Sequence, residues 1–137
     1  MSDIFSRNER SRIMSLVRGK HTEPEKIVRS MLHQLGLRFR LHRNNLPGCP
    51  DIVMPSKKKA VFVHGCFWHA HKKCPRSKLP ETRPRFWSTK LLGNAERDKR
   101  NLKALRALGW RSLVVWECEL KKPNKVNRKL AKFVLNG

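Results

Sequence analysis

The spacing of apolar residues predicts three helices in the chain beyond residue 21. In residues 22–35 apolar side chains recur every three or four positions, which is typical of a helix with one buried face. Thr22-Glu-Pro-Glu25 is a capping-box signature at the start of this helix, and Gly36 ends it. The predicted core face consists of Ile27, Val28, Met31, Leu32 and Leu35.

The other two helices fill most of the C-terminal half. A long helical stretch begins at Arg85, has Gly93 as the place where a bend would fall, and closes at Gly109. A final amphipathic helix begins near Asn124. The apolar positions are Leu91, Leu92, Ala95, Leu102, Leu105 and Leu108 in the long helix, and Val126, Leu130, Phe133 and Val134 in the last one.

Four segments have the pattern of β-strands. Residues 37–42 alternate apolar with polar side chains, which indicates a strand with one buried face. Residues 51–54 and 60–63 are apolar runs joined by a basic turn, and residues 110–116 are the strongest strand. Pairing of the two short runs would bring Asp51 next to a histidine cluster that begins at His64. The order strand, helix, strand predicts an α/β fold, with helices on the faces of a central mixed sheet.

The length and the charge of the chain limit its domain number and the classes of partner that it fits. The 137 residues fit one folded domain, which we expect at residues 21–137, after a basic N-terminal arm or helix at residues 1–20. The arm fits a DNA-binding segment and a solvated surface helix equally well. The net charge of +22, from 32 Lys plus Arg against 10 Asp plus Glu, predicts a polyanionic partner. Nucleic acid fits best because each phosphate contact releases counterions, whereas no long apolar run favours a membrane.

Metal-binding side chains are concentrated in the eleven residues from His64 to Cys74. The polar first ten residues lack a signal-peptide pattern, so we expect a reducing compartment, in which zinc explains loop cysteines better than disulfides. His69 competes with His71 as the nitrogen ligand. The alternative to a zinc site is a set of buried, reduced cysteines. Cys49 stands in a Pro-Gly-Cys-Pro turn and is interpreted as a small loop residue. The candidate Cys3His ligands of a structural zinc site are Cys66, His71, Cys74 and Cys118.

A carboxylate and two histidines form a candidate catalytic group. Asp51 is a hard ligand suited to Mg²⁺, and His64 or His69 could take a proton from an attacking water. Each alone has a simpler explanation, as a turn-capping aspartate or a satisfied polar histidine. Glu25 by itself fits helix capping better than catalysis. Asp98 either belongs to a solvated helix face or holds a histidine such as His64 in its useful tautomer.

Several aromatic side chains lie in basic loops, away from the predicted sheet core. Phe67, Trp68 and Trp87 could enter a DNA base step as exposed wedges, with core packing as the alternative. Trp110 and Trp116 alternate along a strand and fit core packing better.

A set of motifs resembles the very short patch repair (Vsr) DNA mismatch endonucleases, over nearly the whole chain from about Ser11 to Cys118. The segment from Phe62 to His69 is the most specific of them. The motifs are Leu46-Pro-Gly-x-Pro-Asp51, Phe62-Val-His-Gly-Cys-Phe-Trp-His69, Phe86-Trp87, Asn94-x-Glu-Arg-Asp98, and Leu108-Gly-Trp-Arg with Trp116-Glu-Cys118.

The resemblance implies a restriction-endonuclease-like fold and a strand-specific nick 5′ of the thymine in a T:G mismatch left by deamination of 5-methylcytosine. It implies catalytic Mg²⁺ on Asp51 and the main-chain carbonyl of Val63, a general base at His69, and active-site positions at His64 and Glu25. It also implies DNA intercalation by Phe67, Trp68 and Trp87. The ligands that it implies for a structural Zn²⁺ are Cys66, His71, Cys74 and Cys118. The partner would be double-stranded DNA carrying the mismatch, with other mismatch-repair proteins as further candidates, and the protein a cytoplasmic, nucleoid-associated monomer.

Three departures from the family pattern accompany the resemblance. The loop from His71 to Cys74 is one residue longer than the commonest spacing, and Val63 stands where a threonine often lies. The second acidic residue and the lysine of restriction-type sites are missing after Val61, so a histidine must act as base. Two alternatives remain at this level: a zinc-stabilised nucleic-acid-binding module without catalysis, and a basic ribonucleoprotein component.

Overall fold

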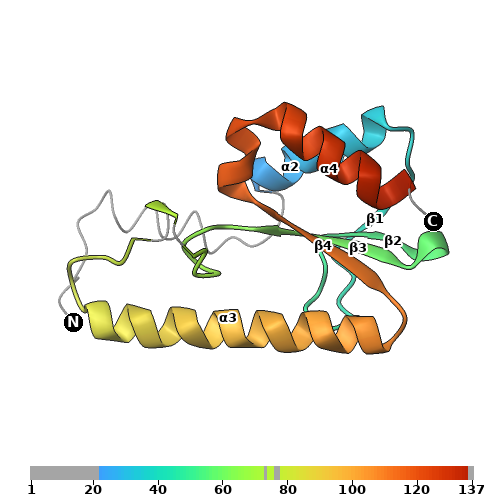
Figure 1. Cartoon of the computed structure of the whole chain (residues 1–137). Helices are drawn as coiled ribbons and strands as arrows, with labels where there is room; N and C mark the ends of the chain where they lie inside the picture. The colour runs from blue at the N-terminus through green and yellow to red at the C-terminus, as the bar shows by residue number, and fades with distance from the viewer. Residues whose placement is uncertain (1–21, 73, 76–77, 136–137) are drawn as a thin grey trace.

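The structure of the protein is a computed structural model that describes residues 22–72, 74–75 and 78–135 (Figure 1). The predicted N-terminal arm at residues 1–20 lies outside the described residues. The elements follow in the order α2 (Glu23–Gln34), β1 (Arg40–Leu41), β2 (Ile52–Met54), a 3₁₀ turn (Pro55–Lys57), β3 (Lys59–His64), α3 (Pro84–Ala107), β4 (Arg111–Trp116), a second 3₁₀ segment (Glu117–Lys121) and α4 (Pro123–Leu135).

The four strands form one mixed sheet in the order β1-β2-β3-β4. The first three pair antiparallel, whereas β3 and β4 are parallel and are joined by α3. This strand, helix, strand crossover was predicted, as was the hairpin between β2 and β3, in which Ile52 lies opposite Val61. The predicted α/β class with helices on a mixed sheet is therefore confirmed.

Helices cover both faces of the sheet (Figure 1). Helices α2 and α4 lie together on one face, and α3 runs along the other. The main core lies under α2 and α4, because their apolar stripes meet the side chains of β2, β3 and β4 that point the same way. Its buried members are Val28, Met31, Leu32, Ile52, Met54, Val61, Val115, Val126, Leu130 and Val134.

Helix boundaries agree well with the capping signals. The Thr22 side chain accepts a hydrogen bond from the backbone N–H of Glu25 at 3.4 Å, which confirms Thr22 as the N-cap of α2. Gly36 and Gly109 follow α2 and α3 with φ of 78° and 86°, the left-handed conformation expected after a helix end. Helix α3 begins at Pro84 and continues without a break through Gly93.

Several apolar side chains that the helical pattern predicted to be buried are exposed. Ile27 is 42% exposed, and Leu92 and Leu108 are also exposed, so the helical period alone overestimated the buried faces. The strand expected at residues 37–42 shrinks to Arg40–Leu41, because it lies at the sheet edge and pairs only with β2. None of the helices in the described part of the chain combines the length and apolar character that crossing a bilayer requires.

The loop before Asp51 packs tightly against α3. Gly48 has a φ of 78°, and a Cβ at this position would lie 3.0 Å from the Asn101 Cβ and 3.1 Å from the Phe62 ring. Any larger residue would therefore have to displace the loop from the helix. This close approach holds the chain that leads into Asp51.

Removing a core side chain should test the placement of α2. Leu32 is fully buried, and Leu32→Ala should lower the free energy of unfolding by about 2–4 kcal/mol because it leaves a cavity between the helix and the sheet. Leu92→Ala is the matched control, since Leu92 is 60% exposed and its loss should cost less than about 0.5 kcal/mol. Urea denaturation followed by circular dichroism measures both, and equal costs would contradict the described core.

Candidate functional site

The hairpin between β2 and β3 brings Asp51 beside Val63, as the sequence predicted. The backbone N–H of Val63 donates a hydrogen bond to the Asp51 Oδ2 at 2.7 Å. His64 is the next residue along β3, so the carboxylate and the first residue of the histidine cluster lie at the same end of the hairpin.

Three side chains gather at this end and are called here the carboxylate cluster: Glu25, His42 and Asp51. One ligand atom from each lies within 4.8 Å of the others. Glu25 is 1% exposed, forms an ion pair with Arg29, and has its Oε1 2.8 Å from the His42 Nε2. Glu25 therefore does more than support the cap of α2: its carboxylate faces Asp51.

Sequence reasoning missed His42 and Arg29. Arg29 stands one helical turn after Glu25, a spacing that commonly gives ion pairs, so the sequence contained this signal. His42 carried no signal, because its side chain meets Glu25 only after β1 pairs with β2 and α2 packs against the sheet.

The surroundings of Asp51 make its negative charge costly. Burial is the main cause that raises the pKa of Asp51 from 3.8 to about 7; the hydrogen bond from the Val63 N–H opposes this rise, and the nearby Glu25 carboxylate contributes to it. Two adjacent carboxyl groups in a poorly solvated place are stabilised when a cation lies between them. Oxygen donors of this kind suit a hard divalent ion such as Mg²⁺.

The second group, the histidine–aspartate cluster, consists of His64, His69 and Asp98, whose ligand atoms also lie within 4.8 Å of one another. The His69 Nδ1 lies 2.5 Å from the Asp98 Oδ2. Because a carboxylate only accepts, this contact assigns the proton to Nδ1 and leaves Nε2 as the acceptor of the ring. The sequence suggested His64 as the partner of Asp98, but the hydrogen bond goes to His69.

His64 stacks on His69, with ring centroids 3.8 Å apart and the planes within 2°. Burial, with a smaller contribution from the neighbouring His69, lowers the pKa of His64 from 6.5 to about 3, and Asp98 opposes the shift. His64 is therefore a neutral imidazole at physiological pH. Its Nδ1 is buried and has no hydrogen-bond partner among the described residues, which marks it as an atom that a bound water or ligand could satisfy.

A third group, the cysteine cluster, contains the four predicted soft ligands, Cys66, His71, Cys74 and Cys118, with their donor atoms within 4.8 Å of one another. The His71 Nδ1 lies 3.4 Å from the Cys118 Sγ. Thiolates on a tetrahedral zinc ion lie about 3.8 Å apart, given Zn–S bonds of about 2.3 Å. The donors are thus close enough to hold a metal ion, even with the longer spacing between His71 and Cys74.

Burial affects the thiols of this cluster. It raises the pKa of Cys66 from 9.0 to about 12 and also raises that of Cys118. The raised pKa values favour the protonated thiols of Cys66 and Cys118, so metal binding would release their protons. The backbone N–H of Cys66 also donates to the Glu117 Oε1 at 3.1 Å, a contact that the sequence did not suggest.

Trp116 lies between the histidine–aspartate cluster and the cysteine cluster. It is the register partner of His64 in the parallel pair of β3 and β4. Its ring stacks on His71 at 4.0 Å and meets the edge of His64 at 5.2 Å. The predicted core role of Trp116 is only partly right, because the residue is half-buried and forms a wall between the two groups.

The expectation of exposed aromatic wedges is wrong for Phe67 and Trp87. Both are buried and pack with Leu91 in a second apolar cluster, with Trp68 partly buried beside them. The Trp68 carbonyl also accepts a hydrogen bond from the Asn94 side chain at 3.1 Å. The aromatic residues are therefore attached to α3 as one packed unit.

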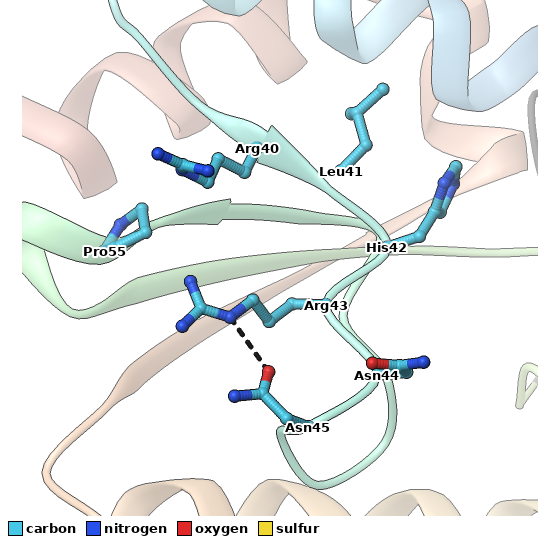
Figure 2. A pocket seen from close by; sticks show the side chains of 7 residues that line it. All are labelled: Arg40, Leu41, His42, Arg43, Asn44, Asn45 and Pro55. Atoms are coloured by element: carbon cyan, nitrogen blue, oxygen red, sulfur yellow. Dashed lines mark hydrogen bonds between the residues drawn. The ribbon is translucent and has the colours of Figure 1, made fainter.

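A pocket of about 820 Å³ lies along the edge strand β1 (Figure 2). Figure 2 shows Arg43 bonded to Asn45 on one side of the chain, while the His42 side chain extends away from both. His42 thus contributes to both the pocket and the carboxylate cluster. The pocket is lined by Arg40, Leu41, His42, Arg43, Asn44, Asn45 and Pro55.

Comparison with known proteins identifies relatives over most of the chain. A family model described as "DNA mismatch endonuclease Vsr" matches residues 2–76. The chain is 54% identical over 120 residues to the type II nicking enzyme V.XorIIP of Xanthomonas oryzae pv. oryzae, covering 88% of each chain. It is 42% identical over 126 residues to the DNA mismatch endonuclease Vsr of Escherichia coli, covering 92% of this chain and 80% of the relative.

A solved structure with a similar fold is the catalytic domain of the homing endonuclease I-Bth0305I. The TM-score is 0.60 and the identity 24%, over 83% of this chain and 95% of that one. This likeness supports the fold, a mixed sheet with flanking helices.

Asp51→Asn should stabilise the protein at neutral and alkaline pH when no Mg²⁺ is added. Because the folded protein holds the Asp51 proton up to about pH 7 and the unfolded chain releases it near pH 3.8, stability falls as the pH rises through this window. Asparagine cannot ionise, so the variant should escape this loss and gain about 1–3 kcal/mol at pH 8. Thermal unfolding at pH 5 and pH 8 measures the effect, and an equal difference at both values would contradict the burial argument.

Proposed function

The chain belongs to the Vsr family of DNA mismatch endonucleases, and we propose that it nicks one strand of duplex DNA on the 5′ side of the thymine in a T:G mismatch, with Mg²⁺ as cofactor. Membership in an endonuclease family sets aside the alternatives of a non-catalytic binding module and of a ribonucleoprotein component. The net charge of +22 suits a polyanionic substrate.

The observation that carries the proposal is the hydrogen bond from the His69 Nδ1 to Asp98. It holds the imidazole with Nε2 as its acceptor, so that His69 can take a proton from the water that attacks the phosphorus. His64 stacks on His69 in a neutral form and could hydrogen-bond an internal water through its buried Nδ1. Asp98 acts through His69 as a positioning residue.

Asp51 and Glu25, with the main-chain carbonyl of Val63, would hold the Mg²⁺. The fit rests on the donor set: two neighbouring carboxyl groups, with the pKa of Asp51 raised by burial, so that a cation beside Asp51 would stabilise its charged form. When bound, the ion supplies positive charge that stabilises the phosphorane-like transition state. Asp51 is anchored for this role by the Val63 N–H.

The cysteine cluster would hold a structural zinc ion through Cys66, His71, Cys74 and Cys118. With four protein ligands the ion would have no open coordination position for catalysis, so its role would be structural. It would hold the loop that carries His69 at the end of β4. Trp116 extends this support because it stacks on the ligand His71 and meets the edge of His64.

We assign recognition of the mismatch to the unit of Phe67, Trp68 and Trp87, in which the half-buried Trp68 would enter the base step and the buried Phe67 and Trp87 would support it. Their rings contact one another, with centroids 5.2–5.8 Å apart, so the three would meet DNA as a unit led by the half-buried Trp68. Insertion of apolar rings between bases costs a few kcal/mol of unstacking, and a mispaired step lowers this cost. We infer a monomeric, cytoplasmic and nucleoid-associated enzyme with a single domain at residues 21–137, which other mismatch-repair proteins could assist.

A nicking assay tests the function directly. Purified protein with Mg²⁺ should nick the thymine strand of a duplex with one T:G mismatch, and should leave both the matched T:A duplex and an EDTA-treated reaction uncut. Asp51→Ala and His69→Ala should each lower the rate at least about 100-fold while preserving DNA binding, because they remove a metal ligand and the proton acceptor. Denaturing gels and a binding titration separate the two effects.

His33→Ala is the matched control, since His33 lies on α2, is exposed, and stacks only on Phe39 among the ring contacts described. It should nick at nearly the wild-type rate. Asp98→Asn should retain more activity than His69→Ala because it disturbs only the orientation of the ring. Wild-type nicking by His69→Ala would remove the catalytic assignment.

Zinc content tests the cysteine cluster. The purified protein should contain one zinc ion per chain by elemental analysis, and Cys118→Ser should lose it and melt at a lower temperature, because the loop is no longer fastened to β4. Cys49→Ser is the control, since Cys49 is exposed and outside the cluster, and it should keep both zinc and melting temperature. Retention of zinc by Cys118→Ser would contradict the assigned ligand set.

A further inference from the structure

His42 has a position that the family resemblance does not account for. Its side chain is largely buried, and its Nε2 lies 2.8 Å from the Glu25 Oε1, in the same group as an Asp51 oxygen. The cluster therefore offers one imidazole nitrogen beside two carboxylates.

The backbone holds His42 firmly at this position. Its N–H donates to the Asp51 carbonyl at 3.0 Å, which extends the pairing of Leu41 with Ile52 by one residue. His42 also has a φ of 49°, a left-handed conformation that is uncommon for a residue with a side chain. The turn that produces this conformation places the ring toward α2 rather than toward Arg43 and Asn45 (Figure 2).

The spacing of the His42 and Glu25 donor atoms matches one edge of an octahedral coordination shell. Adjacent ligands of an octahedral ion with bonds of about 2.1 Å lie about 3.0 Å apart, close to the observed separation of the His42 and Glu25 atoms. The His42 Nε2 and the Glu25 Oε1, which are hydrogen-bonded to each other here, could therefore both bind one ion in place of the shared proton.

We propose that His42 is a direct ligand of the divalent ion at the Glu25 and Asp51 carboxylates, and that it gives this site a preference for Mn²⁺ over Mg²⁺. The inference rests on the proposed metal site and adds the residue that sets its metal preference. Both ions favour oxygen donors, but Mg²⁺ gains little from an imidazole ligand, whereas the softer transition-metal ion Mn²⁺ accepts one nitrogen at less cost. One nitrogen beside two carboxylates is thus a donor set that distinguishes the two ions.

Metal binding without DNA tests the proposal. The zinc-loaded full-length protein is titrated with Mn²⁺, and the free ion is followed by electron paramagnetic resonance; Mg²⁺ affinity follows from competition. The wild type should bind Mn²⁺ more tightly than Mg²⁺. His42→Gln should weaken Mn²⁺ binding at least about tenfold and Mg²⁺ binding less than about threefold, because the glutamine amide can still donate to Glu25 but has no imidazole nitrogen.

Two further variants make the outcome decisive. His33→Gln removes an exposed histidine from α2 and should leave both affinities unchanged, and Asp51→Asn should weaken both ions. Equal weakening of both ions by His42→Gln would show that His42 only positions Glu25, and unchanged affinities would show no role; either result overturns the proposal. Circular dichroism checks that His42→Gln folds, and His42→Asn, which also lacks the imidazole, should lose the same Mn²⁺ preference.

This experiment and the nicking assay can fail independently. In one case the wild-type protein does not nick T:G duplexes, but His42→Gln abolishes its preference for Mn²⁺. The ligand assignment then stands and the mismatch function fails. If the protein nicks T:G duplexes while His42→Gln keeps the wild-type ratio of affinities, the ligand assignment alone fails.

Discussion

The contact between the Asp51 carboxylate and the Val63 N–H is the constraint on which the rest of the site depends. It exists because β2 and β3 form a hairpin in which Ile52 lies opposite Val61, so that Asp51 is carried to the edge of the next strand. Once this register is set, the chain beyond Val63 delivers His64 and then the loop with His69 to the same end of the sheet. A shift of one residue would turn the core residues Ile52 and Val61 to the wrong face, so core packing and site geometry are specified together.

The same end of the sheet carries a cost in stability. Glu25 is 1% exposed, and burial raises the pKa of Asp51 to about 7, so two carboxyl groups lie where neither is well solvated. Arg29 and His42 offset part of this cost at Glu25, and a divalent ion would offset more. The arrangement lowers the stability of the metal-free protein and favours cation binding, which is a common property of sites that hold catalytic metals.

The three clusters form a connected structure rather than separate sites. The loop from Cys66 to Cys74 begins at the end of β3, contains His69, and meets Cys118 just beyond β4. Trp116 lies between the cysteine cluster and the histidine–aspartate cluster, while Asp98 reaches His69 from α3. A metal ion in the cysteine cluster would therefore restrict the loop that also positions the proposed general base.

The sequence by itself determined the order of elements, the α/β class, the hairpin that presents Asp51, and the four donors of the cysteine cluster, because each rests on local periodicity, capping or ligand chemistry. Only the tertiary structure decided which histidine bonds to Asp98, that Phe67 and Trp87 pack together rather than stand exposed, and that His42 joins Glu25 and Asp51. The His42–Glu25 and His69–Asp98 contacts join residues 17 and 29 positions apart, and the packing of Phe67 with Trp87 depends on which face of α3 meets the loop. Periodicity defines the faces of single elements, but it does not determine which side chains meet where two elements pack together.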